Sequence, residues 1–418
     1  MDLPPWAPTL SDGVVTLRAH RPDDVEGILA TCRDPQMQRW TTVPAPYERR
    51  HAEEFVASRP TEWAARRMLT FAVEDADGRY AGTVDLRPDG AAASVGYGLG
   101  PWARGRGLSS RALRLLLEWG FAALDVDVVH WRALVGNWAS RRAAWATGFR
   151  VDGVVRGLLA ERPGRDSVPP RRLDGWVGSL RRGEPMTPAH AWHHPPRLTD
   201  GHAVLRAHRP EDVPRMVEAC SDPLSLQWLP ALPSPYVAVN ALAHLEEIAA
   251  HQADGVAIYW AVGRPDDDTL AGEVGLFGLS PDGVSRTAEI GYWAHPDARG
   301  QRLTTSAVRL VVRHALLPLD VGGLGVQRVL VRAAEGNVAS QRVATSVGLR
   351  PCGRDRDVEL LRDGTVCDLL RYDAVATDLS VDVGPQQAGA AGSGPGGSTP
   401  ADLIGDPVPA HERSRHRA

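Results

Sequence analysis

The segment that decides the fold is residues 95–119, which read VGYGLGPWARGRGLSSRALRLLLEW. Apolar residues recur at helical spacing in its second half, at Leu108, Ala112, Leu115, Leu116 and Trp119. Glycines concentrate in the middle, where they indicate a tight turn. The segment therefore predicts a strand, a glycine-bearing turn and an amphipathic helix in direct succession.

The turn presents backbone N–H groups to whatever lies before the helix. A helix start has four N–H donors without intrahelical partners and a partial positive charge, and glycines allow close approach. Arg104, Arg106, Ser109 and Ser110 add charge and hydroxyl donors at the same place. These features predict a phosphate site, although the spacing is neither a Walker loop nor Gly-x-Gly-x-x-Gly. An ordinary strand-to-helix connection is the alternative.

Composition narrows the class of protein. The chain has 418 residues, of which 43% are hydrophobic, and a formal net charge of −4, which predicts a soluble protein of two or three domains. This charge balance argues against a nucleic-acid partner. The N-terminus has no secretory pattern and no run of about 18 apolar residues occurs, so we expect no membrane partner and a cytoplasmic location. The four cysteines lack C-x-x-C spacing and are expected to be buried.

The chain carries one domain twice. Residues 10–25 reappear at 198–213, an offset of 198 − 10 = 188. Gly96-Tyr97 and Gly136-Asn137 reappear as Gly291-Tyr292 and Gly336-Asn337. A repeat of this length means two whole domains of one fold.

Each copy reads as strands with helices entering between them, which predicts a mixed α/β or α+β sheet. We expect domains at 8–181 and 197–376, a linker at 182–196 and a disordered tail at 377–418. The linker contains His190, His193 and His194. Because these histidines lack cysteine or carboxylate partners at ligand spacing, we expect a solvated linker and no metal.

The glycine-rich turn resembles the Arg/Gln-x-x-Gly-x-Gly/Ala loop of the GNAT N-acetyltransferases, through Arg104, Gly107 and Ser109. Gly-Tyr before the loop and Gly-Asn-x-x-Ser after it occur in both copies and resemble the RimJ/RimL-like branch of that family. The resemblance implies two tandem GNAT-like domains, each with a mixed, mainly antiparallel sheet splayed at the acetyl-CoA site and helices on both faces. It also implies direct acetyl transfer from acetyl-CoA to a primary amine, on a protein N-terminus or a small molecule.

The resemblance also assigns cofactor-binding residues. Gly98 and Leu99 would lie beside the pantetheine arm, which an open strand edge could bind as an added strand. Asn137 would face the same arm, and a plain helix N-cap is its alternative role. The pyrophosphate would contact Arg104, Gly105, Arg106, Gly107, Leu108, Ser109 and Ser110.

The catalytic groups are less clearly marked. Many GNATs use a tyrosine on the helix after the asparagine as the acid, but Ala144 and Ala344 occupy that position here. Ser140 is therefore the candidate for the thiol-facing role. The candidate bases are Asp85, Glu118, Glu273 and Glu289, and a structural or solvated carboxylate is the alternative for each.

The second copy departs from the family pattern, because Arg302 stands where the first copy has Gly107. A side chain there is expected to hinder approach to phosphate unless it turns outward. We therefore expect the first domain to bind acetyl-CoA and the second to have lost or weakened binding. Two other functions stay open: an acyltransferase of thiol-cofactor biosynthesis resembling mycothiol synthase, and a non-catalytic acetyl-CoA-binding or assembly module. The chain is expected to be a monomer with an internal pseudo-dimer, or a homodimer.

Overall fold

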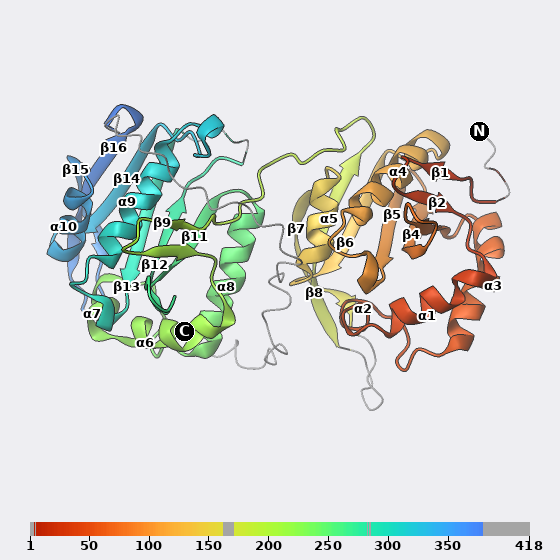
Figure 1. The fold of residues 1–418 in the computed structure, drawn as a ribbon, viewed down its shortest axis with the longest axis horizontal. Helices are drawn as coiled ribbons and strands as arrows, with labels where there is room; N and C mark the ends of the chain where they lie inside the picture. Colours follow the sequence, from red (N-terminus) through yellow and green to blue (C-terminus); the bar gives the residue numbers. More distant parts are fainter. Residues whose placement is uncertain (1–3, 5, 162–170, 282, 284–285, 379–418) are drawn as a thin grey trace. The chain divides into compact units, whose positions relative to one another are not determined.

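Figure 1 shows the computed structural model, which describes residues 4, 6–161, 171–281, 283 and 286–378. The chain divides into two compact units, Met1–Ala189 and His190–Ala418. We call them the first and the second unit. The expected tail lies outside the described residues from position 379 onward.

The first unit is built on one eight-stranded sheet with the order β1-β2-β3-β4-β5-β6-β8-β7. Its strands are Leu10–Ser11 (β1), Thr16–Arg18 (β2), Leu69–Glu74 (β3), Tyr80–Asp89 (β4), Ala92–Leu99 (β5), Val128–Leu134 (β6), Arg150–Ala160 (β7) and Arg172–Arg181 (β8). Neighbouring strands are antiparallel except for β5 and β6, which are parallel. The predicted mixed, mainly antiparallel sheet is confirmed.

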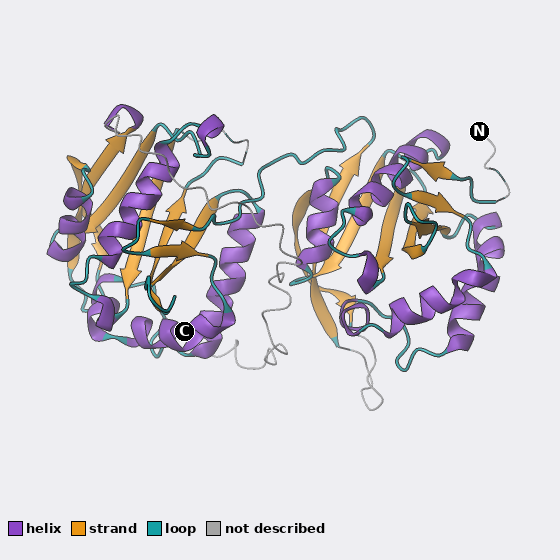
Figure 2. Cartoon of the chain, viewed as in Figure 1, coloured by secondary structure: helices purple, strands orange, loops and turns teal. Residues whose placement is uncertain are grey.

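Helices cover both faces of this sheet, as Figure 2 shows by colour. They are Val25–Arg33 (α1), Pro35–Trp40 (α2), Arg49–Ala64 (α3), Leu108–Ala123 (α4) and Trp138–Ala146 (α5). Arg59 of α3 donates to Thr70 Oγ1 on one face. On β4, Leu86 follows Asp85, the partner of Thr70, and so points to the opposite face of the sheet. There it packs against α4, because a Cβ added to Gly120 would lie 2.5 Å from Leu86 Cδ1. Helices on both faces are therefore confirmed.

The boundary between α1 and α2 follows from the sequence Asp34-Pro35. The Asp34 carboxylate accepts a hydrogen bond from the Met37 amide at 3.0 Å, and proline occupies the first helical position, where its missing N–H costs nothing. The second unit repeats this arrangement with Asp222 and Pro223.

The second unit has the same architecture, with the sheet order β15-β16-β14-β13-β12-β11-β10-β9. Its strands are Leu198–Thr199 (β9), Val204–Arg206 (β10), Ala257–Gly263 (β11), Leu270–Phe277 (β12), Thr287–Ala294 (β13), Arg328–Ala334 (β14), Arg350–Leu360 (β15) and Val366–Val375 (β16). Its α-helices are Val213–Ser221 (α6), Pro223–Trp228 (α7), Ala238–Ala253 (α8), Leu303–Leu316 (α9) and Val338–Ser346 (α10). Short 3-10 turns lie at Pro22–Asp24, Pro101–Ala103, Pro210–Asp212, Pro296–Ala298, Leu319–Val321 and Ala376–Asp378.

Residues 182–196, the expected linker, are held to the units at both ends. The Arg182 guanidinium donates to the carbonyls of Leu124 and Val126 in the first unit, at 3.0 and 2.6 Å. On the other side, the Pro196 carbonyl accepts a hydrogen bond from Trp260 Nε1 at 2.9 Å in the second unit. The segment is therefore part of both packed structures and not a free spacer along its whole length.

Candidate active site

The site of interest begins where two parallel strands diverge. Among the described residues, β5 and β6 pair at three positions only, the last being Ser94 with His130. Both strands then continue, β5 to Leu99 and β6 to Leu134, without pairing to each other. The second unit does the same after Glu289 and Leu330. The predicted splay is confirmed, and it leaves the edge of β5 beyond residue 94 free for another extended chain.

A tyrosine hydroxyl joins the diverging strand to α5. Tyr97 Oη lies 2.7 Å from the Ser140 carbonyl oxygen, to which it donates, and 2.9 Å from Ser140 Oγ. Ser140 Oγ also accepts from Trp131 Nε1 at 3.1 Å. Burial raises the pKa of Tyr97, so the hydroxyl stays protonated. The structure thus places Ser140 at the divergence, inside a hydrogen-bonded network.

Helix α2 lies against the same region from the opposite face. A Cβ added to Gly98 would lie 2.5 Å from Met37 Cε, and one added to Gly136 would lie 3.5 Å from Trp40 Cη2. Met37 and Trp40 therefore reach the free strand and the turn before α5. Sequence reasoning missed Met37 as a site residue, whereas Trp40, which recurs as Trp228, begins one of the two segments in which the sequence predicts acceptor specificity.

The glycine-rich loop ends in the start of α4. Gly105 and Gly107 both have φ of 72°, in the left-handed region, and Gly107 is the N-cap. No described residue accepts a hydrogen bond from the amides of residues 107–110. Added Cβ atoms at both glycines would meet nothing within 4 Å. The loop therefore presents unpaired donors to open space, which is what an anion site requires.

The two arginines of the loop are already engaged. Arg104 donates to Asp34 Oδ2 at 2.6 Å and to the Leu99 carbonyl at 3.2 Å. Arg106 donates to Asp75 Oδ2 at 3.1 Å. Burial alone would raise the pKa of Asp34, but Arg104 and the α2 amides hold it below its usual value. Both arginines thus fix the loop to neighbouring elements, and the backbone amides remain the free donors.

The serines and Asn137 have local roles. Ser110 Oγ donates to the Gly107 carbonyl at 3.0 Å, within the first turn of α4. Asn137 Oδ1 accepts from the Ser140 amide at 3.1 Å and so caps α5. Leu108 is buried beneath the loop, whereas Ser109 is half-buried at its mouth.

The loop of the second unit keeps the same backbone despite Arg302. Arg302 is the N-cap of α9 with φ of 62°, and its side chain is exposed. A non-glycine residue in this conformation costs about 1 kcal/mol. Arg299 donates to Asp222 Oδ2 at 2.5 Å, which repeats the tie between Arg104 and Asp34.

Of the candidate bases, Asp85 is the one buried in the first unit. It lies on β4 opposite Gly96, and Arg87 Nε is 2.9 Å from Asp85 Oδ1. Burial raises the pKa of Asp85, which moves the carboxyl toward the range useful for proton transfer. Because Gly96 has no side chain, β5 presents bare backbone beside this carboxyl.

The other candidates lie in different surroundings. Glu118 is exposed on α4. Glu289 pairs with Arg332, with 2.9 Å between Oε1 and Nε. Glu273 is buried on β12, where His208 Nε2 and His244 Nε2 lie 2.9 and 3.0 Å from its Oε2.

The units differ on the sheet face that α2 and α7 cover. The position of Gly98 is taken by Trp293, which packs against the cluster around Met216 and Tyr236. The position of Thr83 is taken by Glu273. The two units therefore share a backbone framework but not the side chains that line it.

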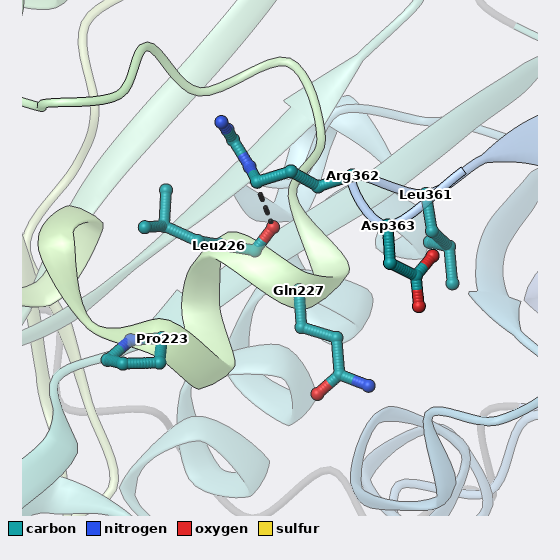
Figure 3. Close-up of a pocket in the computed structure, with 6 residues that line it drawn as sticks. All are labelled: Pro223, Leu226, Gln227, Leu361, Arg362 and Asp363. Carbon is teal, nitrogen blue, oxygen red and sulfur yellow. Dashed lines mark hydrogen bonds between the residues drawn. The ribbon is translucent and has the colours of Figure 1, made fainter. Parts of the chain in front are cut away.

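A surface pocket of about 350 Å³ lies elsewhere on the second unit (Figure 3). It is lined by Pro223, Leu226, Gln227, Leu361, Arg362 and Asp363, and Arg362 Nε donates to the Leu226 carbonyl at 3.4 Å. Helical periodicity puts its α7 residues on a different side of that helix from Ser225 and Trp228. Within the described ranges, no group of three or more His, Cys, Asp or Glu side chains could hold a metal ion, and no helix is long and apolar enough to cross a membrane.

Comparison with known families agrees with this geometry. The model of the acetyltransferase (GNAT) domain matches residues 15–150 and again 202–350, more than half of the chain. The chain belongs to the GNAT acetyltransferase family. Both units are GNAT domains, and the predicted tandem is confirmed.

Individual relatives align with parts of this GNAT tandem. YdaF of Bacillus subtilis, a protein assigned as a ribosomal N-acetyltransferase, is 35% identical over 106 residues, 25% of this chain and 54% of YdaF. The alignment thus spans about half the length of that curated relative. Mycobacterium smegmatis RimJ in complex with CoA-disulfide is similar at 23% identity and a TM-score of 0.37, over 43% of this chain and 90% of RimJ. The ribosomal-protein-S5-alanine acetyltransferase of Vibrio fischeri is similar at 17% identity and a TM-score of 0.37, over 42% and 98% of the two chains.

Proposed function

We propose that the first unit binds acetyl-CoA and transfers its acetyl group directly to a primary amine of a protein. The observation that carries this proposal is the junction of β5 and α4. The free edge of β5 ends where the unpaired amides of residues 107–110 begin. One extended ligand could therefore pair with the strand through its amides and rest its phosphates on the helix start. Membership of the GNAT family supports acetyl-CoA as that ligand.

The choice of a protein amine as the acceptor is based on the similarity to known relatives. YdaF is assigned to ribosomal N-acetylation, and it shares 35% of aligned residues with this chain. The match of both domains to the acetyltransferase model fits the small-molecule acceptor and the two alternative functions as well, so the choice of a protein amine follows from the ribosomal N-acetyltransferase relative alone.

The chemistry asks for three groups around the thioester. The amine must lose a proton as its nitrogen attacks, the carbonyl must be polarised, and the departing thiolate must be stabilised or protonated. We assign the proton acceptor to Asp85, whose pKa is raised by burial beside Gly96. We assign stabilisation of the departing thiolate to Ser140 Oγ as a hydrogen-bond donor, at 2.9 Å from Tyr97 Oη, and the thiolate then takes its proton from solvent. In this step the N–C bond forms, the C–S bond breaks, and Asp85 takes the proton of the amine.

The second unit is proposed to bind acetyl-CoA more weakly. Arg302 replaces the N-cap glycine, and Trp293 occupies the strand position of Gly98. Both changes add side-chain bulk where the first unit has none.

Calorimetric titration of the full chain with acetyl-CoA tests this proposal. We expect one site per chain, which Gly107→Glu removes because it places a carboxylate against the phosphates. Arg302→Glu is the matched control at the equivalent position of the second unit, and it should leave the site intact. Stoichiometric binding by Gly107→Glu would overturn the assignment to the first unit. Absence of binding by the wild-type chain would overturn the acetyl-CoA site altogether.

A further inference from the structure

Each unit has an arginine two residues beyond the point where its parallel strands part. In the second unit this is Arg332, and its Nε lies 2.9 Å from Glu289 Oε1. The hydrogen bond to Glu289 raises the pKa of Arg332, and the charges of Asp355 and Glu359 raise it further. Three carboxylates therefore compensate this guanidinium.

The first unit keeps the arginine and loses all three carboxylates. Arg132 lies two residues beyond the last β5–β6 pair, as Arg332 does for β13 and β14. Strands β7 and β15 carry irregularities at matching places, between Val155 and Leu159 and between Asp355 and Glu359. These registers put Ser94, Val155 and Leu159 where the second unit has Glu289, Asp355 and Glu359.

Arg132 is consequently an uncompensated cation. It is exposed, and it forms no ion pair with any carboxylate in the described part of the chain. The nearby arginine on β4, Arg87, differs in this respect, because its Nε lies 2.9 Å from Asp85 Oδ1.

The position of Arg132 relates it to the reaction proposed above. Trp131 is buried and reaches Ser140 on the α5 side of the sheet. Because side chains alternate along a strand, Arg132 points to the other face, which also carries Asp85. A donor with its phosphates at residues 107–110 and its arm along β5 has its acyl end directed toward residue 94. Arg132 lies on β6 two residues beyond His130, the partner of Ser94, and is therefore near this acyl end.

We propose that Arg132 binds a carboxylate of the acceptor, so that the first unit prefers peptides with acidic residues next to the reactive α-amine. This inference rests on the proposed function, whose acceptor class it narrows. A guanidinium matches a carboxylate with two parallel hydrogen bonds, and such charge-assisted bonds are the strong ones. The apolar neighbours Val155 and Leu159 give the guanidinium no competing partner within the protein.

Two peptides test the inference, Ser-Asp-Glu-Gly-Trp and its neutral counterpart Ser-Asn-Gln-Gly-Trp, each with a free N-terminus. Peptide binding to the CoA-saturated full chain is measured by fluorescence anisotropy of a C-terminal label. In a separate assay with acetyl-CoA as the donor, acetylation is measured by the release of free thiol. We expect the acidic peptide to bind and react at least about tenfold better, as one charge-assisted contact allows. Arg132→Gln should reduce this preference to about twofold or less, and Arg132→Glu should reverse it.

Arg332→Gln is the matched control, because the same substitution in the second unit removes a compensated arginine. It should leave the tenfold preference in place. A wild-type chain that binds both peptides equally, or an Arg132→Gln chain that keeps the preference, would overturn the inference. Failure of the proposed function would give a different result, because Gly107→Glu would then leave acetylation unchanged. The preference for the acidic peptide in the binding assay depends on Arg132 alone and tests the further inference separately.

Discussion

The Tyr97 hydroxyl lies 2.7 Å from the carbonyl oxygen of Ser140 and 2.9 Å from its Oγ, and so connects a strand to a helix across the point where the sheet divides. Beyond residue 94 the strand has lost its β6 partner. The second unit repeats the connection, with 3.0 Å from Tyr292 Oη to both the carbonyl oxygen and Oγ of Ser340. The pair therefore holds the first turn of the helix in place where backbone pairing no longer does.

Replacing Tyr97 by phenylalanine is expected to loosen this connection. The loss of a buried hydrogen bond to Ser140 should destabilise the first unit by about 1–2 kcal/mol, as measured by urea unfolding. Because Ser140 loses its positioning, kcat should fall more than acetyl-CoA affinity. Tyr292→Phe is the control: it should cost similar stability in the second unit and leave kcat unchanged. Equal loss of kcat in both variants would contradict a role of the first unit alone.

The left-handed N-cap position predicts different responses to substitution in the two loops. Gly107→Ala forces a Cβ into φ of 72° and should destabilise the first unit by about 1 kcal/mol. Arg302→Gly relieves the strain at φ of 62° but adds freedom to the unfolded chain, so its stability should change by less than about 0.5 kcal/mol. Calorimetry should instead show stronger acetyl-CoA binding in the second unit. Unchanged second-unit binding would mean that Trp293, and not Arg302, limits it.

Because of His244, the free energy of unfolding of the second unit is expected to decrease at alkaline pH. Burial alone would lower the pKa of His244, but Glu273 raises it to about 9. Because the folded value lies above the unfolded value of about 6.5, the stabilisation is complete below pH 6.5 and is lost as the pH rises through 9. The loss should be on the order of 2 kcal/mol.

A double variant isolates this effect. His244→Phe with Glu273→Thr installs Phe55 and Thr83 of the first unit at the equivalent positions. Thermal unfolding between pH 6 and 9.5, conditions chosen around the pKa of about 9, should show the decline in the wild type and a flat profile in the variant. The same decline in both would assign the titration to other groups.

His20 is expected to give the first unit the opposite dependence. Burial lowers the pKa of His20 to about 4, and its Nε2 lies 3.1 Å from Thr83 Oγ1. The folded value lies below the unfolded value of about 6.5, so stability is complete above pH 6.5 and is lost as the pH falls through 4. The difference in unfolding free energy between the wild type and His20→Gln should shrink by about 2 kcal/mol across that window. A constant difference would show that His20 does not titrate there.

The order of elements in each unit could be predicted from the sequence because it depends on local signals. Helical spacing after Leu108, the Asp34-Pro35 break and the glycine-rich loop are each contained in a few residues. The 188-residue offset then predicts two copies of one fold. The loop motif together with the Gly-Tyr and Gly-Asn-x-x-Ser elements of both copies indicated the GNAT family, and the family comparison confirmed it.

Contacts between distant segments could not be predicted in this way. The sequence predicts Arg104 and Arg106 at the pyrophosphate, but it could not predict that they donate to Asp34 and Asp75, carboxylates far away in the sequence. Met37 and Trp40 reach Gly98 and Gly136 only because α2 crosses that part of the sheet.

The sequence by itself determined the elements, their repeat and the loop that names the family, because backbone propensity and spacing act over a few residues. Only the tertiary structure decided which side chains meet. The register of β6 against β5 and β8, and of β7 against β8, matches that of the second unit and so places Ser94, Val155 and Leu159 around Arg132, where three carboxylates surround Arg332. Register is set by packing and pairing between strands that lie far apart in the chain, and a one-residue shift would move every side chain to the other face.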